Sequence, residues 1–230
     1  MMYRGQDLGD REELIQTCLR VLSQGKEKQL YAVLPHLSVV RSPSFFEPLL
    51  KLLESGKHYQ QEFAALALGI MGDGRAIEPL FKVFMHSSLL RGNGAQSLQA
   101  SIIHALGEVG DEQAIQPLLE IYNLGSESKQ SYGHRRSWVL SAMGNLAQQG
   151  KVLAVKELTR LMRDEDSLLR AQAVTEMAVA FWHRPGELPE TVLHEIISLT
   201  RDPSEDVQTA AFNALSDLAR LGCQAAEQYL

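Results

Sequence analysis

The chain has 230 residues, of which 45% are hydrophobic and 22% are charged. This composition is that of a globular protein long enough to bury a sizeable core. The 28 Asp and Glu residues exceed the 22 Lys and Arg residues, which leaves a formal net charge of −6. That balance argues against a nucleic-acid or membrane-surface binder, because both roles need a basic face.

The N-terminal segment, MMYRGQDLGDREEL, is polar where a signal peptide would have an apolar core. No apolar run approaches the roughly 18 residues that a membrane-spanning helix needs. The two cysteines, Cys18 and Cys223, stand far apart and show no metal-ligand spacing, which argues against a disulfide framework or a zinc site. We therefore expect a soluble, cytoplasmic protein without a metal or a cofactor.

A repeated segment is the strongest signal in the sequence. GIMGDGRAIEPL, which begins at Gly69, recurs as GEVGDEQAIQPL from Gly107 with seven of twelve positions identical. Alanines recur at a nearly constant step of 36 to 38 residues; they are Ala67, Ala105, Ala142, Ala178 and Ala214. A period in this range is typical of solenoid proteins.

The pattern of each repeat unit predicts two helices joined by a tight turn. Apolar residues recur at helical spacing from Phe63 to Ile70 and again from Ile77 to Phe84, and neither helix alone could bury its apolar stripe. Between the two stripes, Gly72 suits a left-handed helix cap and Asp73 suits the start of the next helix. Gly110 and Asp111 repeat this pair.

Two prolines and two acidic turns complete the pattern. Pro79 and Pro117 are compatible with a helix only near its start, so the second helices begin close to them. RDEDSLLRAQAV from Arg163 and RDPSEDVQTAAF from Arg201 match each other at an offset of 38. Each of these segments predicts an acidic turn that leads into a helix.

The sequence therefore predicts an all-α α-solenoid of about five helix pairs with capping helices. We expect a single domain over residues 1–230, with an N-terminal cap at 1–26, repeats at 27–221 and a C-terminal cap at 222–230. Two units depart from the pattern: one reads GNLAQQGKV and the other ends in AFWHRPGELPE.

The segments ALGIMGDGRAIEPL, ALGEVGDEQAIQPL and RDPSEDVQTAAFNAL resemble the HEAT-like repeats of phycobilisome bilin lyases. The resemblance implies a right-handed superhelix whose second helices line the concave face and bind a partner. We favour a non-enzymatic protein-binding adaptor or assembly factor. The resemblance also implies an alternative, a phycobilin lyase subunit or tetrapyrrole- and phycobiliprotein-handling chaperone, and a third alternative is a scaffold in iron–sulfur or photosynthetic complex assembly. If the chain is an enzyme, the resemblance implies a lyase-like subunit.

The links between repeat units gather basic and aromatic residues. In a solenoid these links emerge on one edge, and arginine and tyrosine are enriched at interface hot spots. We therefore hypothesise a partner-binding edge formed by Lys57, His58, Tyr59, Arg91, Tyr132, His134, Arg135 and Arg136. The alternative is that these residues are ordinary solvated charges.

The second helices also carry polar residues that could face a partner. These are Glu78, Lys82, Glu120, Lys156, Arg160 and Glu195. Trp182 and His183 are a candidate ligand pair, although a cover for the helix end is the simpler interpretation. For the tetrapyrrole alternative, Trp182, His183, Arg135, Arg136 and Tyr132 would supply ring stacking and propionate pairing.

Catalytic motifs are not recognisable in the sequence. The seven histidines show no HxxxH or HExxH spacing, and no Gly-rich loop follows a strand pattern. We nominate no catalytic residue. The expected partner is a protein.

Overall fold

A computed structural model describes residues 3–24, 26–88, 93–124 and 129–229, with side chains for all of these except 3–10, 88, 93–94 and 129–133. Every regular element in these ranges is a helix, which confirms the all-α prediction. The chain divides into two compact units, Met1–Val109 and Gly110–Leu230. The single-domain organisation and the right-handed sense of the solenoid stay predictions.

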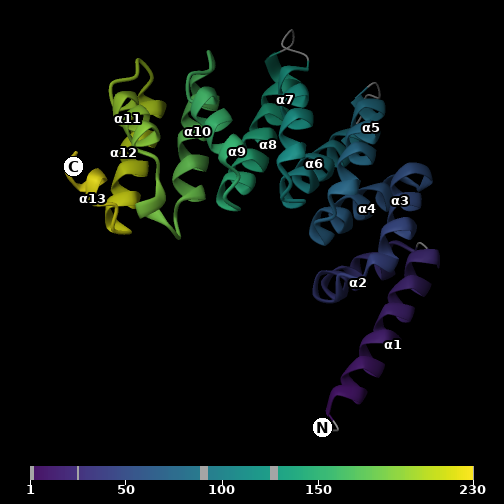
Figure 1. Cartoon of the computed structure of the whole chain (residues 1–230). Coiled ribbons are helices and arrows are strands. Elements are labelled where there is room, and N and C mark those ends of the chain that lie inside the picture. Colours follow the sequence, from purple (N-terminus) through teal and green to yellow (C-terminus); the bar gives the residue numbers. More distant parts are fainter. Residues whose placement is uncertain (1–2, 25, 89–92, 125–128, 230) are drawn as a thin grey trace. The chain divides into compact units, whose positions relative to one another are not determined.

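The first unit begins with a long helix and continues as helical hairpins (Figure 1). Helix α1 packs on α2 and on α3, and its role as an N-terminal cap stays a prediction. The helices of this unit are α1 (Tyr3–Gln24), α2 (Glu27–Val40), α3 (Phe46–Ser55), α4 (His58–Met71), α5 (Ile77–Ser88) and α6 (Asn93–Glu108).

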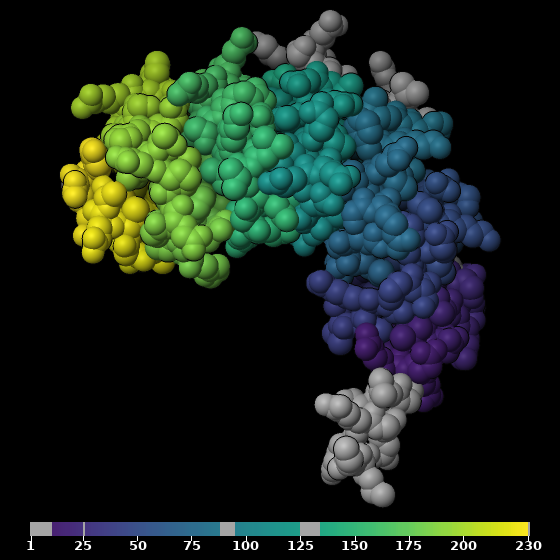
Figure 2. Space-filling view, viewed as in Figure 1, coloured from purple at the N-terminus to yellow at the C-terminus, as the bar shows by residue number. Residues whose placement is uncertain are grey.

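The second unit repeats the same alternation of helices. Its helices are α7 (Ile115–Asn123), α8 (Lys129–Gln148), α9 (Val152–Leu161), α10 (Ser167–Ala180), α11 (Glu190–Leu199), α12 (Glu205–Arg220) and α13 (Gln224–Glu227). Within each unit the hairpins follow one another as successive bands of sequence colour (Figure 2). Helix α13 packs on α12, and its role as a C-terminal cap stays a prediction.

The turns inside the hairpins follow the chemistry that the sequence indicated. Gly72 and Gly110 adopt left-handed backbone angles, with φ of 69° and 72°. The Asp73 carboxylate accepts a hydrogen bond from the Arg75 N–H at 3.0 Å, and Asp111 repeats this cap. Each Asp caps a 3-10 turn that leads directly into the second helix.

The two units that depart from the repeat pattern keep the hairpin. Gly150 has a φ of 85° and ends α8 in the same left-handed way as Gly72. The segment after α10 forms a longer connection with a 3-10 turn at Pro185–Glu187. The irregular sequence therefore changes the turn and preserves the helix pair.

The core of each unit lies between its two rows of helices. All five alanines of the repeated step are buried; they are Ala67, Ala105, Ala142, Ala178 and Ala214. Phe63, Ile77, Leu80 and Phe84 are buried as predicted, whereas Ile70 is only partly covered. A search of the described helices for a long, apolar segment able to cross a bilayer finds none.

Candidate protein-binding surface

The first helices of the hairpins, α4 and α6 in one unit and α8, α10 and α12 in the other, pack closely side by side. A Cβ atom added at Gly69 of α4 would lie 2.7 Å from the Cα atom of Ala105 in α6. In the second unit the most extensive helix contacts join α10 to α8 and to α12. In a curved stack the more closely spaced row is the inner one, so this packing favours the first helices as the inner row of each unit. The resemblance implied the second helices instead.

Helix α10 and the turn after it expose three apolar side chains, which we call the apolar stripe. Leu168, Val179 and Trp182 are 65%, 41% and 44% exposed. Leu168 and Val179, at positions i and i+11, share one face of α10 with the exposed Thr175 between them, and Trp182 follows two residues after the helix ends at Ala180. The opposite face, which carries Leu169 and Met177, is buried. Helix α10 is therefore apolar on both sides, although only one side belongs to the core.

The neighbouring helix α8 borders this stripe with a hydrogen-bonded polar cluster. The Ser141 hydroxyl donates to Glu176 Oε1 at 2.5 Å, and Gln172 Nε2 donates to the carbonyl oxygen of Ser137 at 2.9 Å. Gly144 leaves room for the Glu176 side chain, because a Cβ there would lie 2.7 Å from Glu176 Oε2. These contacts fix the register of α10 on α8.

An aromatic pair lies at the other end of α8. The rings of His134 and Trp138 stack with centroids 6.5 Å apart and an interplanar angle of 25°. Trp138 is half-buried, and His134 is exposed. Trp138 is therefore neither fully in the core nor a free anchor.

Helix α12 borders the stripe on its other side. Its buried residues Val207, Ala211 and Leu215 match Leu169, Ala173 and Met177 of α10 at an offset of 38, as the sequence alignment predicted. We call the solvent-facing side of α8, α10 and α12, with the turn after α10, the first-helix surface. Its residues are His134, Trp138, Ser141, Leu168, Thr175, Glu176, Val179, Trp182, Asp206, Asn213, Asp217 and Arg220.

A buried ion pair fixes α10 to the turn before α12. Arg170 binds both carboxylate oxygens of Asp202, at 3.0 and 2.8 Å. The two side chains are only 15% and 7% exposed. The hydrogen bond from Arg170 lowers the pKa of Asp202. Arg170 Nη1 also donates to the carbonyl oxygen of Asp164, so one side chain links two acidic turns.

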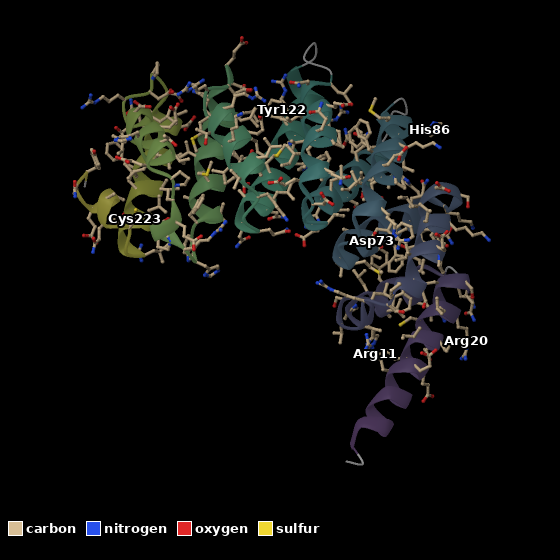
Figure 3. The ribbon with its side chains drawn as sticks, viewed as in Figure 1. Arg11, Arg20, Asp73, His86, Tyr122 and Cys223 are labelled. Atoms are coloured by element: carbon tan, nitrogen blue, oxygen red, sulfur yellow. The ribbon has the colours of Figure 1, made fainter. Side chains whose placement is uncertain are left out.

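A second contact joins α7 to the turn after α9. The Tyr122 hydroxyl donates to Asp164 Oδ2 at 2.5 Å (Figure 3). Burial, together with this hydrogen bond, raises the pKa of Tyr122. Arg136 of α8 lies over the Tyr122 ring and donates to the Tyr122 carbonyl oxygen at 3.2 Å. The sequence analysis proposed Arg136 as a free contact residue and did not identify Tyr122.

The proposed ligand pair lies at the C-terminal end of α10. Trp182 and His183 are exposed there. Arg184 folds back, donates to the Ala147 carbonyl oxygen at 2.5 Å and lies over the Phe181 ring. This arrangement orders the irregular connection and leaves Trp182 facing solvent. Trp182 therefore covers the helix end only in part.

Among the described side chains, the groups proposed for a tetrapyrrole lie apart. Arg184, two residues after Trp182, donates a hydrogen bond to Ala147 near the end of α8, whereas Arg135 and Arg136 lie about twelve residues earlier in that helix, or about 18 Å along its axis. Of Tyr132 the structure describes only the helical backbone. Arg135 is half-buried.

The other residues of the proposed basic edge are described only in part. Lys57 and His58 are exposed and Tyr59 is half-buried at the start of α4. Arg91 lies outside the described residues. That the basic edge forms a binding site stays a prediction.

The polar residues of the second helices are mostly exposed, as expected. Arg160 pairs with Glu157 at 2.8 Å, and Glu195 accepts two hydrogen bonds from Arg163, at 2.8 and 2.6 Å. The hydrogen bond from Arg163 lowers the pKa of Glu195. Glu78, Lys82, Glu120 and Lys156 are exposed, and their role in binding stays a prediction.

The exposed residues Leu168 and Val179 were missed by sequence reasoning. Their signal was present, because α10 carries apolar residues outside the positions that its core face needs. Among the described residues, no group of three or more His, Cys, Asp or Glu side chains is placed to hold a metal ion.

The comparisons with known proteins concern the repeats. Residues 60–80 and 98–123 match the model of the PBS lyase HEAT-like repeat. No curated protein matches the chain.

Several solved structures are similar to the chain at low identity. An engineered protein is 17% identical over 93% of this chain and 98% of its own, with a TM-score of 0.41. A designed armadillo repeat protein in complex with the peptide (KR)4 is 16% identical over 87% and 98%, with a TM-score of 0.40. Human deoxyhypusine hydroxylase in complex with glycerol is 13% identical over 94% and 99%, with a TM-score of 0.41. Similarity at this level says nothing about function.

The family match falls on the α4–α5 and α6–α7 segments, where the repeated glycine, aspartate and proline residues lie. The chain is a helical-repeat protein in which two segments are similar to the PBS lyase HEAT-like repeat.

Proposed function

We propose that this chain is a non-enzymatic adaptor or assembly factor that binds a protein partner on the first-helix surface of its second unit. The exposed apolar stripe of α10 supports this proposal most directly. Large apolar side chains that stay exposed on one side of an ordered helix can anchor a partner, and aromatic residues dominate binding energy at interfaces.

The surrounding structure gives the stripe the rigidity that an interface needs. Gln172 and Glu176 tie α10 to α8, and the ion pair of Arg170 with Asp202 ties it to the turn before α12. A surface that is already ordered loses little conformational entropy when a partner binds.

The test is an affinity purification from the native cell with three forms of the tagged chain, followed by mass spectrometry. The first form is the natural chain, and the second replaces Leu168, Val179 and Trp182 with serine. The third is the control Val152→Ser, which alters a 77% exposed apolar residue on a second helix. Circular dichroism establishes that each form is folded.

We expect a partner that is recovered with the natural chain and with the control and is lost with the triple variant. Recovery with all three forms would contradict the assignment of the surface. In that case charge reversal at Lys156 and Arg160 would test the second helices. Failure to recover any partner with the natural chain would contradict the protein-binding role.

A further inference from the structure

Two acidic residues of α12 lie beside the exposed apolar residues of α10. At the offset of 38 that relates α10 to α12, Asp206 occupies the position of Leu168, and Asp217 occupies that of Val179. Helices α10 and α12 pack side by side. Each of these apolar side chains therefore has an acidic residue next to it on the neighbouring helix.

The two apolar and acidic pairs are evenly placed along the surface. Leu168 and Val179 are eleven residues apart, which corresponds to about 16 Å of helix. Side chains eleven residues apart also share one face of a partner helix. A second helix that lies along α10 could therefore meet both pairs with one of its faces.

The charged side chains of α10 and α12 are mainly acidic. Helices α10 and α12 contain Glu176, Glu205, Asp206 and Asp217 but no lysine. Of their two arginines, Arg170 is held in the buried pair with Asp202. Arg220 is 79% exposed and lies 3.6 Å from Asp217, a contact that water and salt weaken.

From this arrangement we infer that the partner segment is an amphipathic helix with Lys or Arg beside its apolar anchors, and that it lies along α10 and α12. The inference rests on the proposed function and adds the chemistry of the partner to it. The apolar residues of the partner cover Leu168, Val179 and Trp182, and its cations meet Asp206 and Asp217. Complementary charge of this kind selects partners and speeds association.

The test is the selection of binders from a phage-displayed library of random peptides about 16 residues long, which as helices would cover the stripe from Leu168 to Trp182. Selection uses the full chain. Binding of the selected peptides is then measured by titration against the natural chain and against three variants.

The first variant replaces Leu168, Val179 and Trp182 with serine and locates binding at the stripe. The second is Asp206→Lys combined with Asp217→Lys. The third is a matched control with the same change in net charge, Glu112→Lys combined with Glu190→Lys. Both control residues are exposed. Glu112 lies in the 3-10 turn before α7, and Glu190 lies in the first turn of α11 as Asp206 does in that of α12.

We expect the peptides that bind the stripe to be enriched in Lys and Arg at helical spacing beside apolar residues. The double Asp→Lys variant should bind them on the order of tenfold more weakly, and the control should bind them like the natural chain. Added salt should weaken binding to the natural chain more than binding to the double Asp→Lys variant.

Peptides that lose binding to the serine variant but lack basic residues, or that bind the Asp→Lys variant unchanged, would overturn the inference and leave the proposed function standing. If no selected peptide is sensitive to the serine variant, the assignment of the surface itself is wrong.

Discussion

The buried pair of Arg170 and Asp202 offers the sharpest stability test of the repeat stacking. We consider Arg170→Met, which keeps an unbranched apolar stem in place of the arginine methylenes and removes the charged guanidinium. Removal of one partner from a buried ion pair costs about 3–5 kcal/mol, because the other charge stays buried without compensation. Since 15% of the Arg170 side chain is exposed, we expect a smaller loss of about 2–4 kcal/mol in the free energy of unfolding.

A double-mutant cycle measures the interaction energy between Arg170 and Asp202 apart from their other contacts. Asp202→Asn removes the charge but keeps a side-chain oxygen. That oxygen can still accept the hydrogen bond that the Ser204 N–H donates to Asp202 Oδ1 at 2.9 Å in the natural chain. The double variant should lose clearly less stability than the sum of the single losses, with a coupling energy of about 1.5 kcal/mol or more. Urea unfolding followed by circular dichroism gives these free energies, and hydrogen exchange in α10 and α12 shows where the loss occurs.

A second arginine in the same unit provides the control. Arg220 lies 3.6 Å from Asp217, and the two side chains are 79% and 38% exposed. Arg220→Met should therefore have little effect, because exposed ion pairs contribute little to stability. The reasoning is refuted if Arg220→Met destabilises the chain as much as Arg170→Met does, or if the two losses of the cycle simply add.

Two further predictions concern pH and close helix packing. Because the folded pKa of Asp202 is lowered, the stability from its ionised form is complete above the unfolded pKa of about 4 and disappears as the pH falls through the folded value. Arg170→Met should therefore lose less stability than the natural chain on acidification, as measured by urea unfolding at each pH. Gly69→Ala should cost about 1–3 kcal/mol, because the new methyl group meets the Ala105 backbone at 2.7 Å. Gly186→Ala meets no atom within 4 Å and should leave the melting temperature nearly unchanged; equal losses for the two glycines would contradict the packing argument.

Local features of the fold were predictable because they depend on residues close together in the chain. A glycine followed by an aspartate specifies a left-handed cap and a new helix start, and Gly72 with Asp73 forms that structure (Figure 3). The buried alanines were equally predictable, since a constant small residue in a helix pattern indicates close approach of neighbouring helices.

The candidate surface was only partly predictable. Trp182 was identified from its residue type, but the exposure of Leu168 and Val179 on α10 was not predicted. The sequence of α10 is apolar on several faces, so the pattern did not show which face the neighbouring helices cover. Arg136 was proposed as a free contact residue because sequence does not show that its guanidinium packs on Tyr122.

The sequence by itself determined the helices, their turns and the repeated hairpin, because these follow from spacing and from the backbone preferences of single residues. The tertiary structure decided which helices pack most closely, which charges pair across turns and which apolar residues remain at the surface. Those properties depend on contacts between residues more than thirty positions apart, such as Arg170 with Asp202. A one-dimensional pattern does not contain the distances that make such contacts.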